Sequence, residues 1–280
     1  MRVRAGDVRL HVTTLGDEWR DGSRRPDIIA VHGGPGIDGG MLRLTMRPAA
    51  EYAHVVVPDL RGHGRSDRGG PADWNLDVWA DDLAALVDTL GLERPYLLGT
   101  SFGGFVVQRF LSRHPRVPGG AILVGTGARQ ASHDEIVERH RVLGGDRAAA
   151  VMRRSLTDHS AQAEREWAEV CGPLAMRRTP DEAYQRAVRG RIATPEVNAA
   201  FIPQLSTLDL RADLAAARCR VMVLVGEDDP LIPYEVAAEI VASLPGRAGE
   251  LHVVPGASHQ VIWDAPEAAH SLIRKFTEGS

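Results

Sequence analysis

Gly99-Thr100-Ser101-Phe102-Gly103 decides how this chain is interpreted, because a serine stands between two glycines where a strand pattern changes into a helix pattern. The apolar residues 96–98 precede this stretch, and a helical pattern over 102–114 follows it. A strand, a tight turn and a helix form the setting of the G-x-S-x-G nucleophile elbow. Serine at the apex of such a turn has strained backbone angles, and small neighbours let the surrounding chain approach closely. We therefore take Ser101 as the candidate nucleophile.

A second glycine-rich loop follows another short apolar run. Residues 28–31 are Ile-Ile-Ala-Val, and they lead into His32-Gly33-Gly34-Pro35-Gly36. Such a loop exposes backbone N–H groups. In acyl-transfer hydrolases these donors stabilise the oxyanion of the tetrahedral intermediate, and loss of one slows turnover by roughly a hundred- to a thousandfold. We assign the N–H groups of Gly34 and Phe102 to an oxyanion hole. A plain strand-to-helix turn is the alternative interpretation of the loop.

Two acidic residues follow the strongest β-branched run of the chain. Residues 221–225, Val-Met-Val-Leu-Val, lead into Gly226-Glu227-Asp228-Asp229-Pro230. A serine nucleophile needs a base and a carboxylate that orients the base. A carboxylate placed here lies at the carboxyl end of a strand, on the sheet edge where ligands bind. We prefer Asp229, three residues after Gly226, as this acid, and expect Asp228 to face solvent or to cap the loop.

The candidate base follows the last strand pattern. Residues 251–254 lead into Pro255-Gly256-Ala257-Ser258-His259, so serine, acid and histidine occur in the order that the elbow motif requires. We take His259 as the base. His32 is expected to orient the oxyanion loop through side-chain hydrogen bonds, and His63, within residues 61–67, to brace the site. The remaining histidines are interpreted as ordinary polar residues: His11, His54, His114, His133, His140, His159, His252 and His270.

Taken together, these motifs give the chain a family resemblance. It resembles the α/β-hydrolases over nearly its whole length, with core motifs at 31–36, 59–67, 99–104, 226–233 and 256–266. The 32–36 loop and Gly256-Ala257-Ser258-His259 are similar to the proline iminopeptidase-like branch, peptidase family S33. That branch usually has Trp after the nucleophile and the sequence D-Q-R-G in the loop near residue 60. This chain has Phe102 and Asp59-Leu60-Arg61-Gly62, which resemble general esterases, haloperoxidase-like hydrolases and lactonases of the same fold.

Short apolar runs alternate with helical stretches along the chain. Strands are predicted at 8–14, 28–31, 55–57, 96–98, 121–124, 221–225 and 251–254, which favours a mostly parallel sheet covered by helices on both faces. The clearest helix runs over 77–90 and ends at Gly91, and a closing helix runs from 265 towards 276. We expect an α/β core domain, residues 1–127 and 206–280, with a helical cap, residues 128–205, inserted after the sixth core strand.

Composition excludes several classes of protein. The chain has 280 residues, 44% of them hydrophobic, and a formal net charge of −4, which suffice for a core and give no reason to expect a nucleic acid partner. We see no signal peptide and no spanning helix, and the two cysteines stand apart, so a cytoplasmic location without membrane association is expected. No metal site and no organic cofactor are implied. Oligomeric state is left open.

The cap is where substrate choice is expected. Its helical pattern is broken at Gly144-Gly145, Gly172-Pro173, Thr179-Pro180 and Thr194-Pro195. In aminopeptidases of the branch that the chain resembles, acidic cap side chains hold the free amine of the substrate. The resemblance makes Glu196 the first candidate for that contact, with Glu164, Glu166 and Glu169 behind it, although a carboxylate on a charged helix usually faces solvent. Trp167 is a candidate lining residue for an acyl or prolyl pocket, with packing as the alternative.

These observations predict a serine hydrolase that acts through an acyl-enzyme on a small ester or amide. Its substrate would be a small molecule or a short peptide, and release of N-terminal proline or another small residue is one form of the activity. A carboxylesterase or lactonase without peptidase activity is the alternative. An acyltransferase or cyclase would use the same three residues while excluding water. A ligand-binding protein that has the same fold but no catalytic activity is the third functional class considered.

Overall fold

The computed structural model describes residues 1–20, 22–158 and 160–279. Its strands are β1 (Arg2–Ala5), β2 (Val8–Leu15), β3 (Trp19–Arg20), β4 (Ser23–Arg24), β5 (Asp27–Val31), β6 (His54–Pro58), β7 (Tyr96–Thr100), β8 (Gly120–Val124), β9 (Arg220–Gly226) and β10 (Gly249–Val254). Its α-helices are α1 (Gly40–Thr45), α2 (Leu76–Leu90), α3 (Phe102–Arg113), α4 (His133–Ser155), α5 (Ala161–Val170), α6 (Glu182–Arg189), α7 (Pro195–Leu205), α8 (Arg211–Leu214), α9 (Tyr234–Ser243), α10 (Val261–Asp264) and α11 (Pro266–Glu278). Three 3₁₀ turns complete the set: η1 (Arg47–Glu51), η2 (Pro71–Asp73) and η3 (Gly172–Ala175).

One large sheet organises these elements. Its eight strands run in the order β1-β2-β6-β5-β7-β8-β9-β10. The pairs from β6 to β10 are parallel, whereas β1, β2 and β6 pair antiparallel. The predicted mostly parallel α/β sheet is therefore confirmed. The carboxyl ends of β5, β7, β8, β9 and β10 share one edge, which is where a ligand site is expected in such sheets.

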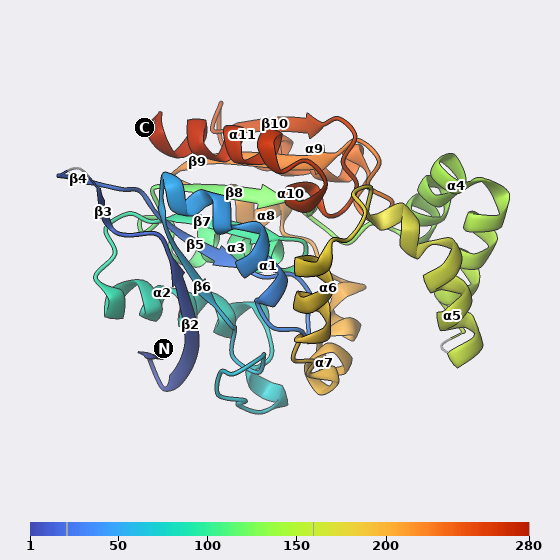
Figure 1. Cartoon of the computed structure of the whole chain (residues 1–280), viewed down its shortest axis with the longest axis horizontal. Helices are drawn as coiled ribbons and strands as arrows, with labels where there is room; N and C mark the ends of the chain where they lie inside the picture. Colours follow the sequence, from blue (N-terminus) through green and yellow to red (C-terminus); the bar gives the residue numbers. More distant parts are fainter. Residues whose placement is uncertain (21, 159, 280) are drawn as a thin grey trace.

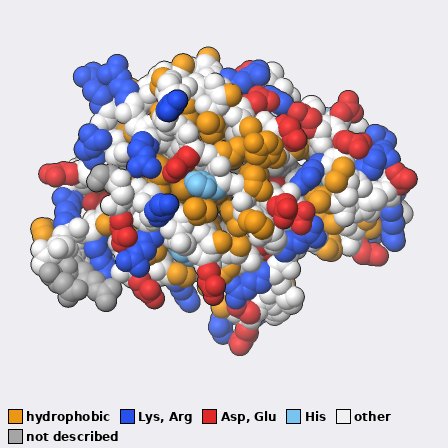
Figure 2. All heavy atoms as spheres, turned by 90° about the horizontal axis from the view of Figure 1, so that it is seen from above, with side chains coloured by type: hydrophobic (Ala, Val, Ile, Leu, Met, Phe, Trp, Pro, Cys, Tyr) orange, Lys and Arg blue, Asp and Glu red, His pale blue; other side chains and the backbone are white. Residues whose placement is uncertain are grey.

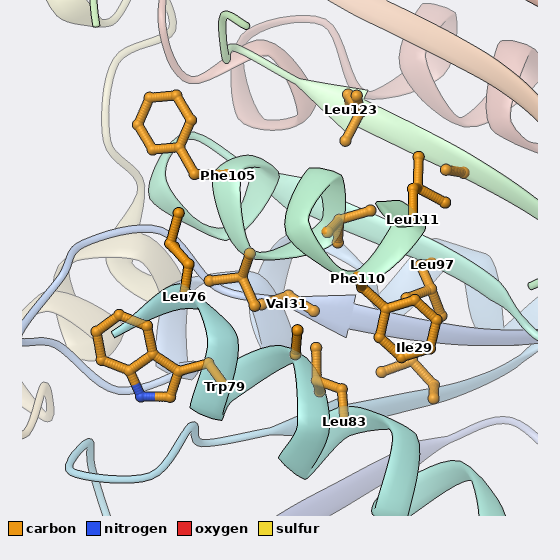
Figure 3. Packing of buried hydrophobic residues seen from close by; sticks show 14 of the residues in the cluster. Ile29, Val31, Leu76, Trp79, Leu83, Leu97, Phe105, Phe110, Leu111 and Leu123 are labelled. Atoms are coloured by element: carbon orange, nitrogen blue, oxygen red, sulfur yellow. The ribbon is translucent and has the colours of Figure 1, made fainter. Parts of the chain in front are cut away.

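The central strands are buried on both faces. In β5, Ile29 and Val31 point into one hydrophobic cluster, which α2, α3, α8 and α9 cover, while Ile28 and Ala30 point into the other, beneath α1, α10 and α11. This alternation follows from the two-residue period of a strand. Figure 3 shows the first cluster, where Trp79 and Leu83 of α2 and Phe110 of α3 pack onto the sheet. The continuous apolar runs of the sequence are thus explained by helices on both faces.

The predicted strands and helices are all present. Each of the seven predicted strands is longer by one or two residues, because hydrogen-bonded pairing continues past the apolar run. The helix predicted over 77–90 is α2, which begins after Asn75 and ends at Gly91 in the left-handed region, with φ 63°. The Asn75 side chain accepts from the N–H of Val78, as an N-cap does. Strand β1 and the small β3–β4 hairpin were not predicted; β1 is a short edge strand with arginines on its outer face.

Among the residues that the structure describes, four α-helices and η3 lie between β8 and α8, within the predicted cap. The predicted breaks are confirmed as ends or kinks of α4 to α7, and Gly145, with φ 74°, divides α4 into two parts. Figure 1 shows α4 and α5 projecting from one end of the molecule, while α6 and α7 lie close to the sheet domain. α6 packs against α1. No helix in the described ranges is long and apolar enough to cross a membrane.

A buried ion pair fixes the loop after β6. The Arg61 guanidinium donates from Nε and Nη2 to the two carboxylate oxygens of Asp82 on α2, at 2.9 and 2.8 Å. Both side chains are at least 92% buried. The same loop contacts α2 again, because the Trp79 indole donates to the Arg61 carbonyl at 3.0 Å. This pair holds residues 59–67 against the core beneath the site.

Asp82→Ala is expected to lower the free energy of unfolding by about 3–5 kcal/mol, because it leaves a buried guanidinium without its bidentate partner. Asp81→Ala is the matched control on the same helix. Asp81 pairs with Arg113 and His114 while its side chain is 47% exposed, so its loss should cost about 0–1 kcal/mol. Urea unfolding of both variants measures the difference. Equal losses would show that the Arg61 pair does not hold the loop.

Candidate active site

Ser101 stands at the tight turn between β7 and α3, with φ 50° and ψ −118°. Its neighbours explain the glycines of the motif. A Cβ on Gly99 would lie 2.4 Å from the carbonyl oxygen of Gly103, and a Cβ on Gly103 would lie 2.4 Å from that of Val31. Real side chains do not fit at such distances, so only glycine lets β7, α3 and β5 approach this closely. The strained serine backbone persists because this packing fixes it.

The structure brings Ser101, His259 and Asp229 into one hydrogen-bonded chain. His259 Nε2 lies 3.1 Å from Ser101 Oγ, and His259 Nδ1 lies 2.9 Å from Asp229 Oδ2. The other carboxylate oxygen, Oδ1, accepts the N–H groups of Leu231 and Ile232 at 2.8 and 3.0 Å. Asp229 is fully buried. With Nδ1–H donating to Asp229, Nε2 is free to accept the proton of the Ser101 hydroxyl.

Burial and charge act against each other on the base. Burial alone would lower the pKa of His259, but the charge and hydrogen bond of Asp229, together with the charge of Asp264, raise that pKa above its usual 6.5. The imidazolium that forms when His259 takes a proton is thereby stabilised. Gly125, which follows β8, also adjoins this pair: a Cβ there would lie 3.1 Å from the His259 carbonyl oxygen. Gly125 was not among the site residues predicted from the sequence.

Asp228 lies beside the site without joining it. Its carboxylate pairs with Arg177 at 2.9 Å, and its side chain is 33% exposed. Of the two candidate acids, therefore, only Asp229 reaches the histidine. The geometry agrees with the preference drawn from the spacing after Gly226.

The glycine-rich loop after β5 lies beside the nucleophile. Gly34 and Phe102 both border a small cavity together with Ser101 and His259. Gly34 has φ 133°, which favours glycine, and Phe102 is the first residue of α3, where a helix leaves its N–H groups free to bind a ligand. These placements suit two oxyanion donors.

Two neutral histidines support this loop. His32 Nε2 accepts the N–H of Leu60 at 3.2 Å, so its Nδ1–H donates to the Gly33 carbonyl at 2.8 Å. His63 donates from Nδ1 to the Arg61 carbonyl at 2.9 Å, and its ring meets the edge of His32. Burial lowers the pKa of His32, and burial is also the largest cause that lowers the pKa of His63, to about 3. The expected hydrogen bonds of His32 and bracing position of His63 are both present. His159 lies outside the described residues.

Two cavities meet at the nucleophile. The larger, about 330 Å³, has a mostly apolar wall that includes Met41, Val261 and Trp263, with Tyr184 and Arg191 contributed from the α6 region. The smaller, about 170 Å³, is bordered by Phe105, Ile136 and Leu205. Both include Ser101 and His259. On the face shown in Figure 2, hydrophobic side chains gather near the middle beside a histidine, with charges of both signs around them.

The structure does not bring the two cap candidates to these cavities. Glu196 is exposed in the first turn of α7, and Trp167 on α5 packs against the small hydrophobic cluster of α4 and α5. Neither is among the described residues that line either cavity. These contacts are the packing expected as the alternative for Trp167, and a binding role for either residue stays a prediction. Glu164, Glu166 and Glu169 share α5, which projects away from the sheet in Figure 1.

The residues that do line the larger cavity from the cap side were missed. Tyr184 lies in the first turn of α6, and Arg191 just beyond that helix. Nothing in the sequence distinguishes their side chains from others on a charged, alanine-rich helix. Their place on the same cavity wall as Ser101 depends on α6 packing against α1, a segment distant in the sequence. Asp38 is the acidic side chain on this wall among the described residues, and it pairs with Arg43 at 2.8 Å.

Comparisons with known proteins show the family and the fold of the chain. A family model described as alpha/beta hydrolase fold matches residues 26–266. The chain is 27% identical over 254 residues to the 2-hydroxymuconate semialdehyde hydrolase of Pseudomonas sp. strain CF600. This alignment covers 89% of this chain and 86% of that protein. The structure of proline iminopeptidase from Mycobacterium smegmatis is similar with a TM-score of 0.84 at 21% identity, covering 100% of this chain and 97% of that one. A proline iminopeptidase-related protein of Thermus thermophilus gives 0.75 at 28% identity, covering 98% and 95%.

Proposed function

The chain belongs to the alpha/beta hydrolase fold family, and from this premise we propose that it is a serine hydrolase that cleaves small esters or lactones with an apolar acyl group through an acyl-enzyme. One observation carries the proposal: the hydrogen-bonded chain Ser101–His259–Asp229 opens into a cavity of about 330 Å³ with a mostly apolar wall. A concave apolar pocket with a few convergent polar groups is the usual form of a small-molecule site.

The mechanism follows from the hydrogen bonds. His259 Nε2 accepts the proton of Ser101 Oγ while that oxygen attacks the carbonyl carbon of the substrate. The N–H groups of Gly34 and Phe102 hold the oxyanion that forms. The leaving alcohol takes the proton from His259 as the ester bond breaks, which leaves an acyl group on Ser101. A water molecule then gives its proton to His259 and attacks that ester, and Ser101 Oγ takes the proton back from His259 as its bond to the acyl group breaks and the acid is released. Asp229 keeps the ring in the required tautomer throughout.

The two cavities supply a place for each half of the substrate. Both touch Ser101 and His259, so a substrate held at the nucleophile can extend its acyl part into one and its leaving group into the other. Their size suits short chains, because about 330 Å³ lies at the small end of ligand pockets. Tyr184 and Trp263, whose ring centroids are 4.6 Å apart, give the larger cavity an aromatic wall.

An aminopeptidase that accepts a free amine is the second candidate, and Asp38 favours it. This carboxylate lines the larger cavity, and its Oδ1 is buried without a hydrogen-bond partner in the structure. An ammonium group would satisfy that oxygen. Against it stands the pairing of the same carboxylate with Arg43, which already offsets its charge. We therefore place ester cleavage first.

Rates on two chromogenic substrates decide between these candidates. A short-chain p-nitrophenyl ester and a prolyl anilide with a free amine are compared, with Ser101→Ala as the background. The proposal expects the ester to be cleaved far faster than the anilide. Preference for the anilide, lost when its amine is blocked, would establish the aminopeptidase instead. Product analysis with an added alcohol shows whether the acyl group passes to water or to another acceptor.

The pH dependence of kcat/KM is expected to show an acid limb with a midpoint above 6.5. His259 must be neutral to act as a base, and Asp229 and Asp264 together raise its pKa above that ordinary value against the effect of burial. Activity therefore falls as the pH falls through this raised pKa. Initial rates on the p-nitrophenyl ester, extrapolated to low substrate, measure the midpoint. A midpoint below 6.5 would mean that burial outweighs the two carboxylates.

A further inference from the structure

One carboxylate joins the loop of the base to the cap. Asp264 ends the short helix α10, and its Oδ2 accepts the N–H of Ser258 at 2.8 Å. Its Oδ1 accepts the N–H groups of Arg177 and Arg178, at 2.9 and 3.0 Å. Ser258 directly precedes His259, while Arg177 and Arg178 lie in the loop between η3 and α6. One carboxylate oxygen of Asp264 thus binds the loop that carries the base, and the other binds the segment between η3 and α6.

Further contacts hold the same cap segment, residues 174–178, on α10. The Ser258 hydroxyl donates to the Leu174 carbonyl, and the Trp263 indole donates to the Arg178 carbonyl at 3.2 Å. The Arg178 guanidinium lies 4.3 Å over the Trp263 ring. Trp263 in turn forms part of the wall of the larger cavity. The segment is therefore docked beside both the base and the substrate space.

We propose that Asp264 is a positioning residue that ties His259 to the cap segment 174–178, so that the base is held in place for catalysis only while this segment is docked. The inference rests on the proposed function, because it assigns to His259 the role of the base. Ionised carboxylates make stronger hydrogen bonds than neutral acceptors, and three N–H donors converge here. An asparagine at position 264 has one acceptor oxygen, and its NH₂ group, which only donates, would face N–H groups that also donate.

Charge gives Asp264 a second effect that packing alone does not have. The carboxylates acting on His259 are Asp229, on the loop after β9, and Asp264, on α10. The cap segment contributes the Arg177 side chain, which pairs with Asp228, and the Arg178 side chain, which stacks on Trp263. Asp38 and Arg191 are the other charged residues on the cavity wall. Removing the charge of Asp264 takes away one of the groups that raise the pKa of the base.

Asp264→Asn and the matched control Glu267→Gln test this role. Both remove one negative charge, but Glu267 is exposed on α11, three residues further on. Asp264→Asn is expected to lower kcat on the p-nitrophenyl ester on the order of tenfold, since at least one of the three N–H donors loses its acceptor. The acid limb of kcat/KM should also move to lower pH. Glu267→Gln should leave both unchanged. A purely structural defect would reduce the folded fraction without moving the pH profile.

Amide hydrogen exchange tests the tie without relying on activity or on the folding of a variant. In the wild-type protein, the N–H groups of Arg177 and Arg178 lie in an exposed loop, so slow exchange there is expected only if Asp264 accepts from them. Their exchange should become fast in Asp264→Asn and stay slow in Glu267→Gln. Fast exchange in the wild type, or an unchanged kcat and pH profile in a folded Asp264→Asn, would overturn the proposal. Absence of ester turnover by the wild type would contradict the proposed function, while the exchange rates would still decide whether the tie exists.

Discussion

Ser101→Ala is expected to lower kcat on a p-nitrophenyl ester by roughly a millionfold, to near the background rate. The hydroxyl is the atom that forms the acyl-enzyme, and no other group lies in its place at the apex of the turn. The oxyanion donors and the cavity remain, so a residual acceleration over the uncatalysed reaction is expected. Stopped assays with concentrated enzyme measure a rate this low.

The same variant should fold normally. Alanine fits wherever serine fits, and the hydrogen bond that is lost is the one between the Ser101 hydroxyl and His259. Unfolding in urea should therefore match the wild type to within about 1 kcal/mol. A Ser101→Ala protein that is folded and keeps more than a few per cent of the wild-type activity would show that another residue is the nucleophile.

Asp229→Asn is expected to lower kcat by roughly ten-thousandfold, because an amide cannot hold the histidine in the tautomer that leaves Nε2 free. The fully buried carboxylate accepts from His259, Leu231 and Ile232. An asparagine that keeps the two backbone bonds through its oxygen turns its NH₂ group towards Nδ1. The ring then donates from Nε2 towards Ser101, which is the wrong direction for a base.

Asp228→Asn is the control for that loop. It is adjacent in sequence, carries the same charge and pairs with Arg177 at the surface rather than with the histidine. Its kcat should stay within about threefold of the wild type, as expected for a partly exposed ion pair. A large loss in Asp228→Asn together with a small loss in Asp229→Asn would exchange the roles of the two residues.

The sheet and the placement of the three residues could be predicted because their causes are local. Ser101, Asp229 and His259 each follow a short apolar run, and the runs become parallel strands whose carboxyl ends share one edge. Once the strands are identified, the three side chains must come close together. The predicted resemblance to α/β-hydrolases is confirmed by the family match, and a proline iminopeptidase and a proline iminopeptidase-related protein are among the similar structures.

The cap could not be predicted at the level of side chains. The resemblance suggested Glu196, and residue type suggested Trp167. Glu196 is exposed on α7, and Trp167, on α5, packs against the hydrophobic cluster of α4 and α5. Which face of a short, charged helix meets the core depends on packing between segments distant in the sequence, such as α6 on α1. The contact of Asp264 with Arg177 and Arg178 has the same origin, since these arginines precede Asp264 by 87 and 86 positions in the sequence. That residues 128–205 form a cap with a part in substrate choice stays a prediction.

The most direct test of the account is covalent labelling of the folded protein with a fluorophosphonate probe, followed by peptide mapping by mass spectrometry. The probe reacts with a serine whose hydroxyl is activated by a neighbouring base. We expect one equivalent to be incorporated, on the peptide that contains Ser101, with no labelling of Ser101→Ala and strongly slowed labelling of Asp229→Asn. No incorporation into the wild type, or incorporation on a different residue, would contradict the claim that Ser101, His259 and Asp229 form a working nucleophilic site.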